Sequence, residues 1–199
     1  MPKQYDQAYF DRWYRDPKHR QWAEPGIARK VRMVVGVVEY LLERPIRSML
    51  DVGCGEGSWQ PILADLRPKA RYQGVDASEY AVRRFGRERN IRRGSVGDLG
   101  SLGLRNRYDV VVCCDVLHYV TTPEIRQGLA AMVKLARGPA YLEAYTSRDD
   151  VTGDNVDFQR RSPLAYRRLF AEAGFTAHVG PHMYVTNDFK KGLVELEKS

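Results

Sequence analysis

Three glycines stand at every second position in the segment 48–59, SMLDVGCGEGSW, directly after an apolar run. Glycine at this spacing lets the backbone approach a bound ligand closely, because no Cβ atom stands between them. Two acids accompany the glycines: Asp51 precedes the first of them and Glu56 lies inside the loop. The segment therefore predicts a ligand-binding loop at the end of a buried strand.

The pattern argues against one common ligand of such loops, a dinucleotide. A dinucleotide-binding loop has the form G-x-G-x-x-G and brings a pyrophosphate to a helix N-terminus. Counted from Gly53, the third glycine position holds Ser58, and Glu56 would repel a pyrophosphate. The loop suits a ligand that lacks phosphates and carries a positive centre.

A second group of reactive residue types lies in the segment 113–120, CCDVLHYV. His118 is a candidate general base near neutral pH, or it packs under the loop as a structural residue. Asp115 is a candidate for orienting an amine or a cofactor, or it caps the following turn. Cys113 and Cys114 are interpreted as small apolar residues of a buried strand. The chain has no Cys/His spacing typical of a metal site.

Strand and helix patterns alternate along the chain around these groups. Apolar runs predict strands at 47–53, 71–76, 108–116 and 140–145, with a weaker one within 90–99. Helical patterns occur at 26–45, 58–66, 78–89, 122–138 and 162–174, with Ser78, Thr122 and Ser162 as predicted N-caps. This alternation predicts an α/β fold with a Rossmann-like, doubly wound sheet, mostly parallel. A predicted hairpin at 175–185 adds an antiparallel C-terminal strand.

Two segments stand outside the alternation, and both are expected near the carboxyl ends of the strands, where open α/β sheets bind ligands. Residues 1–25 place Tyr5, Tyr9 and Trp13 four residues apart, on one stripe of a helix. This stripe packs on the core or forms a lid over a cationic ligand, with Trp13 and Tyr14 as lid contacts. Residues 145–161 form a polar connection long enough to be a substrate loop.

Five segments in order resemble the class I S-adenosylmethionine-dependent methyltransferases, and the resemblance covers nearly the full length. They are LDVGCGEG (50–57), YQGVDAS (72–78), GSVGDL (94–99), YDVVVCCDVLHYV (108–120) and LFAEAGF (169–175) before the hairpin. Within that family, cytosine-C5 methylation uses a Pro-Cys or Thr-Cys context, and exocyclic base amines are methylated by an Asn/Asp-Pro-Pro-Tyr/Phe signature. Neither occurs here.

The resemblance implies a role for particular residues in binding S-adenosylmethionine. Asp76 is expected to accept hydrogen bonds from the ribose hydroxyls, and Asp98 and Leu99 to contact the adenine. Cys54 is expected to pack beneath the methionine end of the ligand. The expected cofactor-binding residues are Asp51, Gly53, Cys54, Gly55, Asp76, Ala77, Asp98, Leu99, Cys114 and Trp13. The candidate catalytic residues are His118, Asp115 and Tyr14.

The expected activity is in-line methyl transfer from S-adenosylmethionine to N or O of a small molecule, leaving S-adenosylhomocysteine. Two alternatives remain open at this point. The net charge of +7 and the arginine-rich stretch 83–93 are compatible with an RNA or protein acceptor. The third interpretation is an inactive cofactor-binding module that serves a partner.

Composition predicts a globular chain of one domain, residues 1–199. Hydrophobic residues make up 43% and charged residues 29% of the sequence, without an apolar run of membrane-spanning length or a signal-peptide core. Three cysteines form no disulfide framework, so a cytoplasmic location is expected. We expect a monomer or homodimer that holds no metal and does not associate with a membrane.

Overall fold

A seven-stranded sheet forms the centre of the computed structural model, which describes residues 3–18, 24–104, 107–151 and 153–195. The strands are β1 Ser48–Val52, β2 Arg71–Asp76, β3 Ile91–Arg93, β4 Val110–Cys114, β5 Pro139–Glu143, β6 Phe175–Gly180 and β7 Met183–Thr186. Their order is β3-β2-β1-β4-β5-β7-β6. The pairs among β1 to β5 are parallel, and β7 runs antiparallel to both its neighbours. The predicted mostly parallel sheet with an antiparallel C-terminal strand is confirmed.

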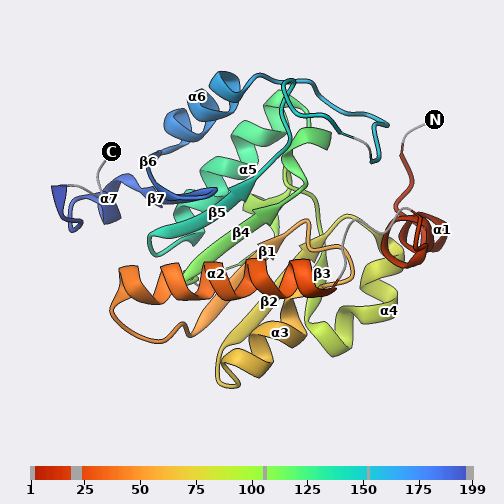
Figure 1. Cartoon of the computed structure of the whole chain (residues 1–199), viewed down its shortest axis with the longest axis horizontal. Coiled ribbons are helices and arrows are strands. Elements are labelled where there is room, and N and C mark those ends of the chain that lie inside the picture. Colours follow the sequence, from red (N-terminus) through yellow and green to blue (C-terminus); the bar gives the residue numbers. More distant parts are fainter. Residues whose placement is uncertain (1–2, 19–23, 105–106, 152, 196–199) are drawn as a thin grey trace.

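The helices cover the sheet on both faces (Figure 1). They are α1 Gln7–Phe10, α2 Glu24–Leu42, α3 Trp59–Leu66, α4 Glu79–Arg89, α5 Thr122–Leu135, α6 Pro163–Ala173 and α7 Asn187–Lys190. Helices α2 and α3 lie on one face, and α5 and α6 on the other (Figure 1). None of the helices in the described ranges is long and apolar enough to span a bilayer.

The central strands are buried on both faces because each lies between two hydrophobic clusters. Alternate residues of a strand point to opposite faces. In β4, Val111 and Cys113 pack into the cluster under α5 and α6, whereas Val110 and Val112 pack into the cluster under α2 and α3. This double burial explains why β4 reads as a continuous apolar run in the sequence.

Helix boundaries follow the predicted caps, with one shift. Ser78 and Ser162 accept hydrogen bonds from the first turns of α4 and α6, as predicted. The cap of α5 is Thr121 rather than Thr122, because Thr121 forms a capping box with Glu124. Pro123 then occupies the second helical position, where its missing N–H costs no hydrogen bond.

The N-terminal segment differs from a regular helix. Helix α1 has only one turn and continues into a π-helical turn, Asp11–Arg15. The Tyr5 residue of the predicted stripe precedes α1, and its ring contacts that of Tyr9 edge-on at 5.1 Å between centroids. The Tyr14 ring contacts that of Phe10, four residues earlier, at 5.0 Å between centroids.

Two glycines inside helices provide a test of how closely the helices pack against the rest of the fold. A Cβ atom on Gly128 of α5 would lie 2.3 Å from Cγ1 and 2.6 Å from the carbonyl oxygen of Val96. A Cβ atom on Gly36 of α2 would meet nothing within 4 Å. We expect Gly128→Ala to lower the free energy of unfolding by about 1–3 kcal/mol through overpacking. Gly36→Ala should raise it by up to about 1 kcal/mol, because alanine favours the helix. Urea denaturation measures both, and shifts of the same sign would contradict this account.

Candidate active site

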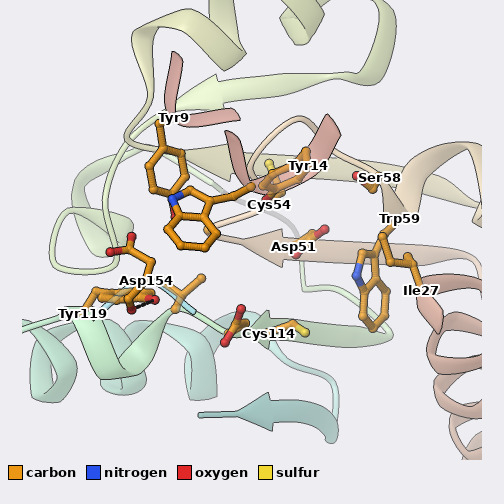
Figure 2. Close-up of a pocket in the computed structure, with 14 residues that line it drawn as sticks. Tyr9, Tyr14, Ile27, Asp51, Cys54, Ser58, Trp59, Cys114, Tyr119 and Asp154 are labelled. Atoms are coloured by element: carbon orange, nitrogen blue, oxygen red, sulfur yellow. Dashed lines mark hydrogen bonds between the residues drawn. The ribbon is translucent and has the colours of Figure 1, made fainter. Parts of the chain in front are cut away.

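Two adjoining cavities lie at the carboxyl ends of β1, β2 and β4, where the strand order reverses between β1 and β4. We call them the β4 cavity, of about 90 Å³, and the β2 cavity, of about 260 Å³. Asp154 and Tyr119 lie together at one end of the β4 cavity and Trp59 at the other (Figure 2). The two cavities share six lining residues, Tyr9, Tyr14, Gly53, Asp115, Val116 and Tyr119. These residues mark the junction between the cavities.

The glycine loop after β1 forms one wall of both cavities. The amides of Gly53 and Cys54 donate to the carbonyl oxygen of Val75, at 2.7 and 3.1 Å. Gly53 and Gly55 have positive φ angles of 74° and 55°, a region that side chains disfavour. A Cβ atom on Gly55 would also lie 2.6 Å from the Tyr14 hydroxyl. Glycine is required at both positions by conformation and by close approach.

Asp76 lies at the end of β2, where it lines the β2 cavity. Its Oδ2 accepts the Gly55 amide at 2.7 Å and its Oδ1 accepts the Ser78 amide at 2.8 Å. Burial raises the pKa of Asp76, and these two hydrogen bonds lower it in part. Each carboxylate oxygen keeps a further lone pair for a ligand hydroxyl.

Asp51 lies at the floor of the β4 cavity and is 2% exposed. Burial raises its pKa to about 7, opposed by the Tyr72 hydroxyl, which donates to Asp51 Oδ2 at 2.7 Å. Cys54 packs with Phe85 and Ile91 below the loop. Burial raises the thiol pKa of Cys54 well above its ordinary value, so the thiol stays protonated.

Asp115 follows β4 with a left-handed backbone, φ 61°, and lines both cavities. Burial and, next, Glu143 raise its pKa to about 7. Its Oδ1 lies 3.4 Å from Nε2 of His118. His118 itself is completely buried and lines neither cavity. Burial lowers its pKa to about 4, which leaves the imidazole neutral at pH 7.

Lys30 and Glu143 form a charged pair beside Cys114, at the ends of β4 and β5. The Lys30 ammonium lies 2.8 Å from Glu143 and 3.5 Å from the Cys114 sulfur. Burial raises the pKa of the Cys114 thiol well above its ordinary value. The thiol therefore stays neutral and contributes only shape to the β4 cavity.

The N-terminal segment contributes lining residues to both cavities, and three polar contacts hold it against the rest of the fold. Arg15 forms an ion pair with Glu56 of the glycine loop at 2.7 Å. The Ser78 hydroxyl donates to the carbonyl oxygen of Tyr5. The Lys3 ammonium pairs with Asp154 of the 145–161 loop, and both side chains are more than nine-tenths buried. Residues 1–2 and 19–23 of the predicted lid, residues 1–25, lie outside the described residues.

Two of the expected adenine contacts lie elsewhere. Asp98 turns its carboxylate toward Ser95, whose amide and hydroxyl donate to Oδ2 at 3.2 and 2.8 Å. Leu99 is 1% exposed and packs in the core under α5. The backbone stretch 94–97 lines the β2 cavity instead, together with Ala77. Among the described residues, no three His, Cys, Asp or Glu side chains converge on a possible metal position.

Comparisons with known proteins agree with this geometry. Residues 50–140 match a family model described as a methyltransferase domain. This part of the chain is an S-adenosylmethionine-dependent methyltransferase domain. The matched residues of this methyltransferase run from β1 to β5 and contain both the glycine loop and the tip of β4.

Solved structures show the same fold at low sequence identity. The chain is similar to magnesium protoporphyrin IX methyltransferase from Synechocystis PCC 6803 with bound S-adenosylhomocysteine, at 19% identity and a TM-score of 0.58, covering 92% of this chain and 94% of that one. It is also similar to Streptomyces venezuelae DesVI, at 14% identity and a TM-score of 0.63, covering 80% and 91%. The plantazolicin methyltransferase BpumL with S-adenosylhomocysteine gives 15% identity and a TM-score of 0.61, covering 81% and 72%. No curated protein matches the methyltransferase in sequence.

Three residues of the site were not singled out from the sequence. Asp154 lies in the 145–161 segment, which was expected to matter without any residue being chosen. Trp59, directly after the loop, lines the β4 cavity and packs on Tyr141 with centroids 5.8 Å apart. Lys3 gave no signal, because an isolated lysine near a chain end resembles an ordinary surface residue.

The raised pKa of Asp51 predicts a pH-dependent stability. An unfolded aspartate titrates near pH 4, whereas folded Asp51 titrates near pH 7. Between these pH values only the folded chain keeps this proton. The free energy of unfolding of the wild type therefore falls by on the order of a few kcal/mol as pH rises from 4 to 7. Asp51→Asn lacks this loss. Its stability relative to the wild type should therefore rise over that window and level off above pH 7, as measured by urea denaturation.

Asp109→Asn is the matched control. Asp109 is also buried, but hydrogen bonds from Arg44 and the Arg47 amide outweigh that burial and lower its pKa. Its contribution to stability is therefore complete above pH 4 and lost only in more acidic solution. Asp109→Asn should lower the free energy of unfolding by the same amount at every pH between 5 and 8. If the free energy of unfolding of both variants, relative to the wild type, changed with pH by the same slope, the raised pKa assigned to Asp51 would be wrong.

Proposed function

We propose that this methyltransferase transfers a methyl group from S-adenosylmethionine to N or O of a small molecule held in the β4 cavity. One observation carries the proposal: two cavities of different chemistry meet at a junction lined by Gly53, Tyr14 and Asp115. The β2 cavity suits the adenosine end of S-adenosylmethionine. The β4 cavity suits its methionine end and an acceptor.

The β2 cavity offers ribose and base contacts. Asp76 lines the cavity, is held by two backbone amides and has lone pairs left to accept hydrogen bonds, which suits the two ribose hydroxyls. We propose that the adenine meets the backbone of residues 94–97. Asp98, which was expected to contact the adenine directly, then acts by holding Ser95 in this turn.

The junction and the β4 cavity suit the cationic parts of the same ligand. We propose that Asp51, which lines the β4 cavity, pairs with the methionine ammonium, and this pairing would stabilise its ionised form. The rings of Tyr9, Tyr14 and Tyr119 surround the junction, and aromatic faces stabilise a sulfonium as they do other cations. Trp13 closes the β4 cavity from the lid.

The chain's contribution to the reaction is positioning. S-adenosylmethionine supplies the electrophilic methyl group when bound. The lid excludes water, and the fixed walls of the junction hold an acceptor in line with the sulfur–methyl bond. Asp115, rather than His118, faces the acceptor and is the candidate for orienting it or accepting its proton.

The small β4 cavity favours a small acceptor over a macromolecule. It holds only about 90 Å³ beneath the N-terminal segment. The arginines of stretch 83–93 line neither cavity, and most are exposed on α4 and β3. A strongly salt-dependent association with RNA would favour the alternative of a nucleic-acid acceptor.

Calorimetry with S-adenosylmethionine tests the assignment of Asp76. Asp76→Ala removes both ribose contacts, so the Kd should rise about 10- to 100-fold, as expected for lost charged hydrogen bonds. The control is Asp65→Ala on α3, an exposed aspartate remote from both cavities, which should leave the Kd unchanged. Equal binding by Asp76→Ala and the wild type, or no binding by the wild type, would overturn the assignment.

A further inference from the structure

We propose that the acceptor is an amine, received as an ammonium ion by a cradle formed by Tyr119, Asp154 and Asp115. This inference rests on the proposed function and names the substrate class of the same site.

The charge of the β4 cavity carries the first step of the argument. Its described lining contains three carboxylates, Asp51, Asp115 and Asp154, and no lysine, arginine or histidine. If Asp51 pairs with the methionine ammonium of the cofactor, Asp115 and Asp154 remain for the acceptor. A cavity with two carboxylates beyond Asp51 and with aromatic walls attracts a cation and penalises an anion.

The protein's own ammonium group occupies this cradle in the structure. Lys3 Nζ lies 3.4 Å from the centroid of the Tyr119 ring and pairs with the Asp154 carboxylate. The rings of Tyr5 and Tyr9 follow at 5.1 and 5.3 Å. The Lys3 side chain is only 7% exposed. Burial lowers the pKa of its ammonium and Asp154 raises it in part, so the cradle offsets part of the loss of water. Because Lys3 belongs to the lid segment, an acceptor ammonium can replace it when that segment moves.

Asp115 supplies the second carboxylate, in a fixed orientation. Its Oδ1 is buried and makes no hydrogen bond, although Nε2 of His118 lies 3.4 Å away. Nδ1 of His118 accepts the Tyr145 amide at 3.3 Å, which places the proton of the neutral ring on Nε2. His118 Nε2 lies beside Asp115 without a hydrogen bond to it, so Oδ1 is an acceptor without a partner among the described residues.

The reaction balances with these groups. An acceptor R–NH₃⁺ gives one proton to the Asp115 carboxylate and becomes R–NH₂ with a free electron pair. That pair forms the new N–CH₃ bond while the sulfur–methyl bond breaks and its electrons return to sulfur. The products are R–NH₂CH₃⁺ and neutral S-adenosylhomocysteine, and Asp115 later releases its proton to water.

Proton affinity favours an amine over an alcohol at this carboxylate. Asp115 has a pKa of about 7. An alkylammonium has a pKa of roughly 10, whereas an alcohol is about as weak an acid as water and has a far higher pKa. Proton transfer to Asp115 from an alkylammonium therefore requires far less free energy than proton transfer from an alcohol.

The test compares the binding of a cation with that of its uncharged isostere. Choline and 3,3-dimethylbutan-1-ol have the same shape and differ in the charge of one central atom. Calorimetry on the full-length protein saturated with S-adenosylhomocysteine should give a Kd for choline at least tenfold below that of the alcohol. Equal affinities would overturn the proposal. If neither choline nor the alcohol binds, equal affinities of benzylamine and benzyl alcohol, where the cation carries N–H donors, would overturn it.

Four variants separate this proposal from nonspecific binding. Asp154→Asn and Asp115→Asn should each remove most of the preference for choline, and asparagine tolerates the left-handed backbone at 115. Lys3→Ala should instead strengthen choline binding severalfold, because it empties the cradle. Asp65→Asn, on the exposed side of α3, should change nothing. Weaker binding of choline to Lys3→Ala would contradict the role of Lys3 as the occupant.

Turnover gives an independent readout. With radiolabelled S-adenosylmethionine, methylation of benzylamine in preference to benzyl alcohol supports the proposal, and the reverse order overturns it. Failure of the amine inference leaves binding of S-adenosylhomocysteine intact, whereas failure of the proposed function abolishes that binding. The two failures are therefore distinguishable in the same calorimeter.

Discussion

The hydrogen bond from the Gly55 amide to Asp76 joins the loop after β1 to the end of β2, and both cavities depend on it. The loop must bend back toward β2 to make this contact, which requires the left-handed conformations of Gly53 and Gly55. Once the loop is bent, its backbone leaves space for the Tyr14 hydroxyl and for Val116 beside the glycines. The N-terminal segment and the tip of β4 are thus placed by the same short stretch of backbone.

The site is acidic although the chain carries a net charge of +7. Burial keeps Asp51 and Asp115 close to their protonation midpoints near pH 7, so the empty site avoids part of the cost of holding like charges together. A cationic ligand reverses that balance by stabilising the ionised carboxylates. The net positive charge of the chain therefore does not describe the charge of the site.

Much of the fold could be predicted because each layer leaves a local signal in the sequence. β4 is apolar at every position since both its faces are buried, and Ser78 and Ser162 mark their helices as caps. Asp76 could be located because a strand ends there. The orientation of Asp98 could not, since its turn closes through Ser95, and the full burial of His118 depends on the distant loop that supplies Phe158 above its ring. Lys3 and Asp154 are 151 positions apart, and no local pattern links them.

The short strand β3 forms one edge of the sheet, where its unpaired backbone groups face outward. Arg92 and Arg93 are both exposed on it. Charged side chains on a short edge strand hinder pairing with the strand of another molecule. The arginine-rich stretch that suggested a macromolecular partner thus has a second explanation: it protects the open edge of the sheet against aggregation.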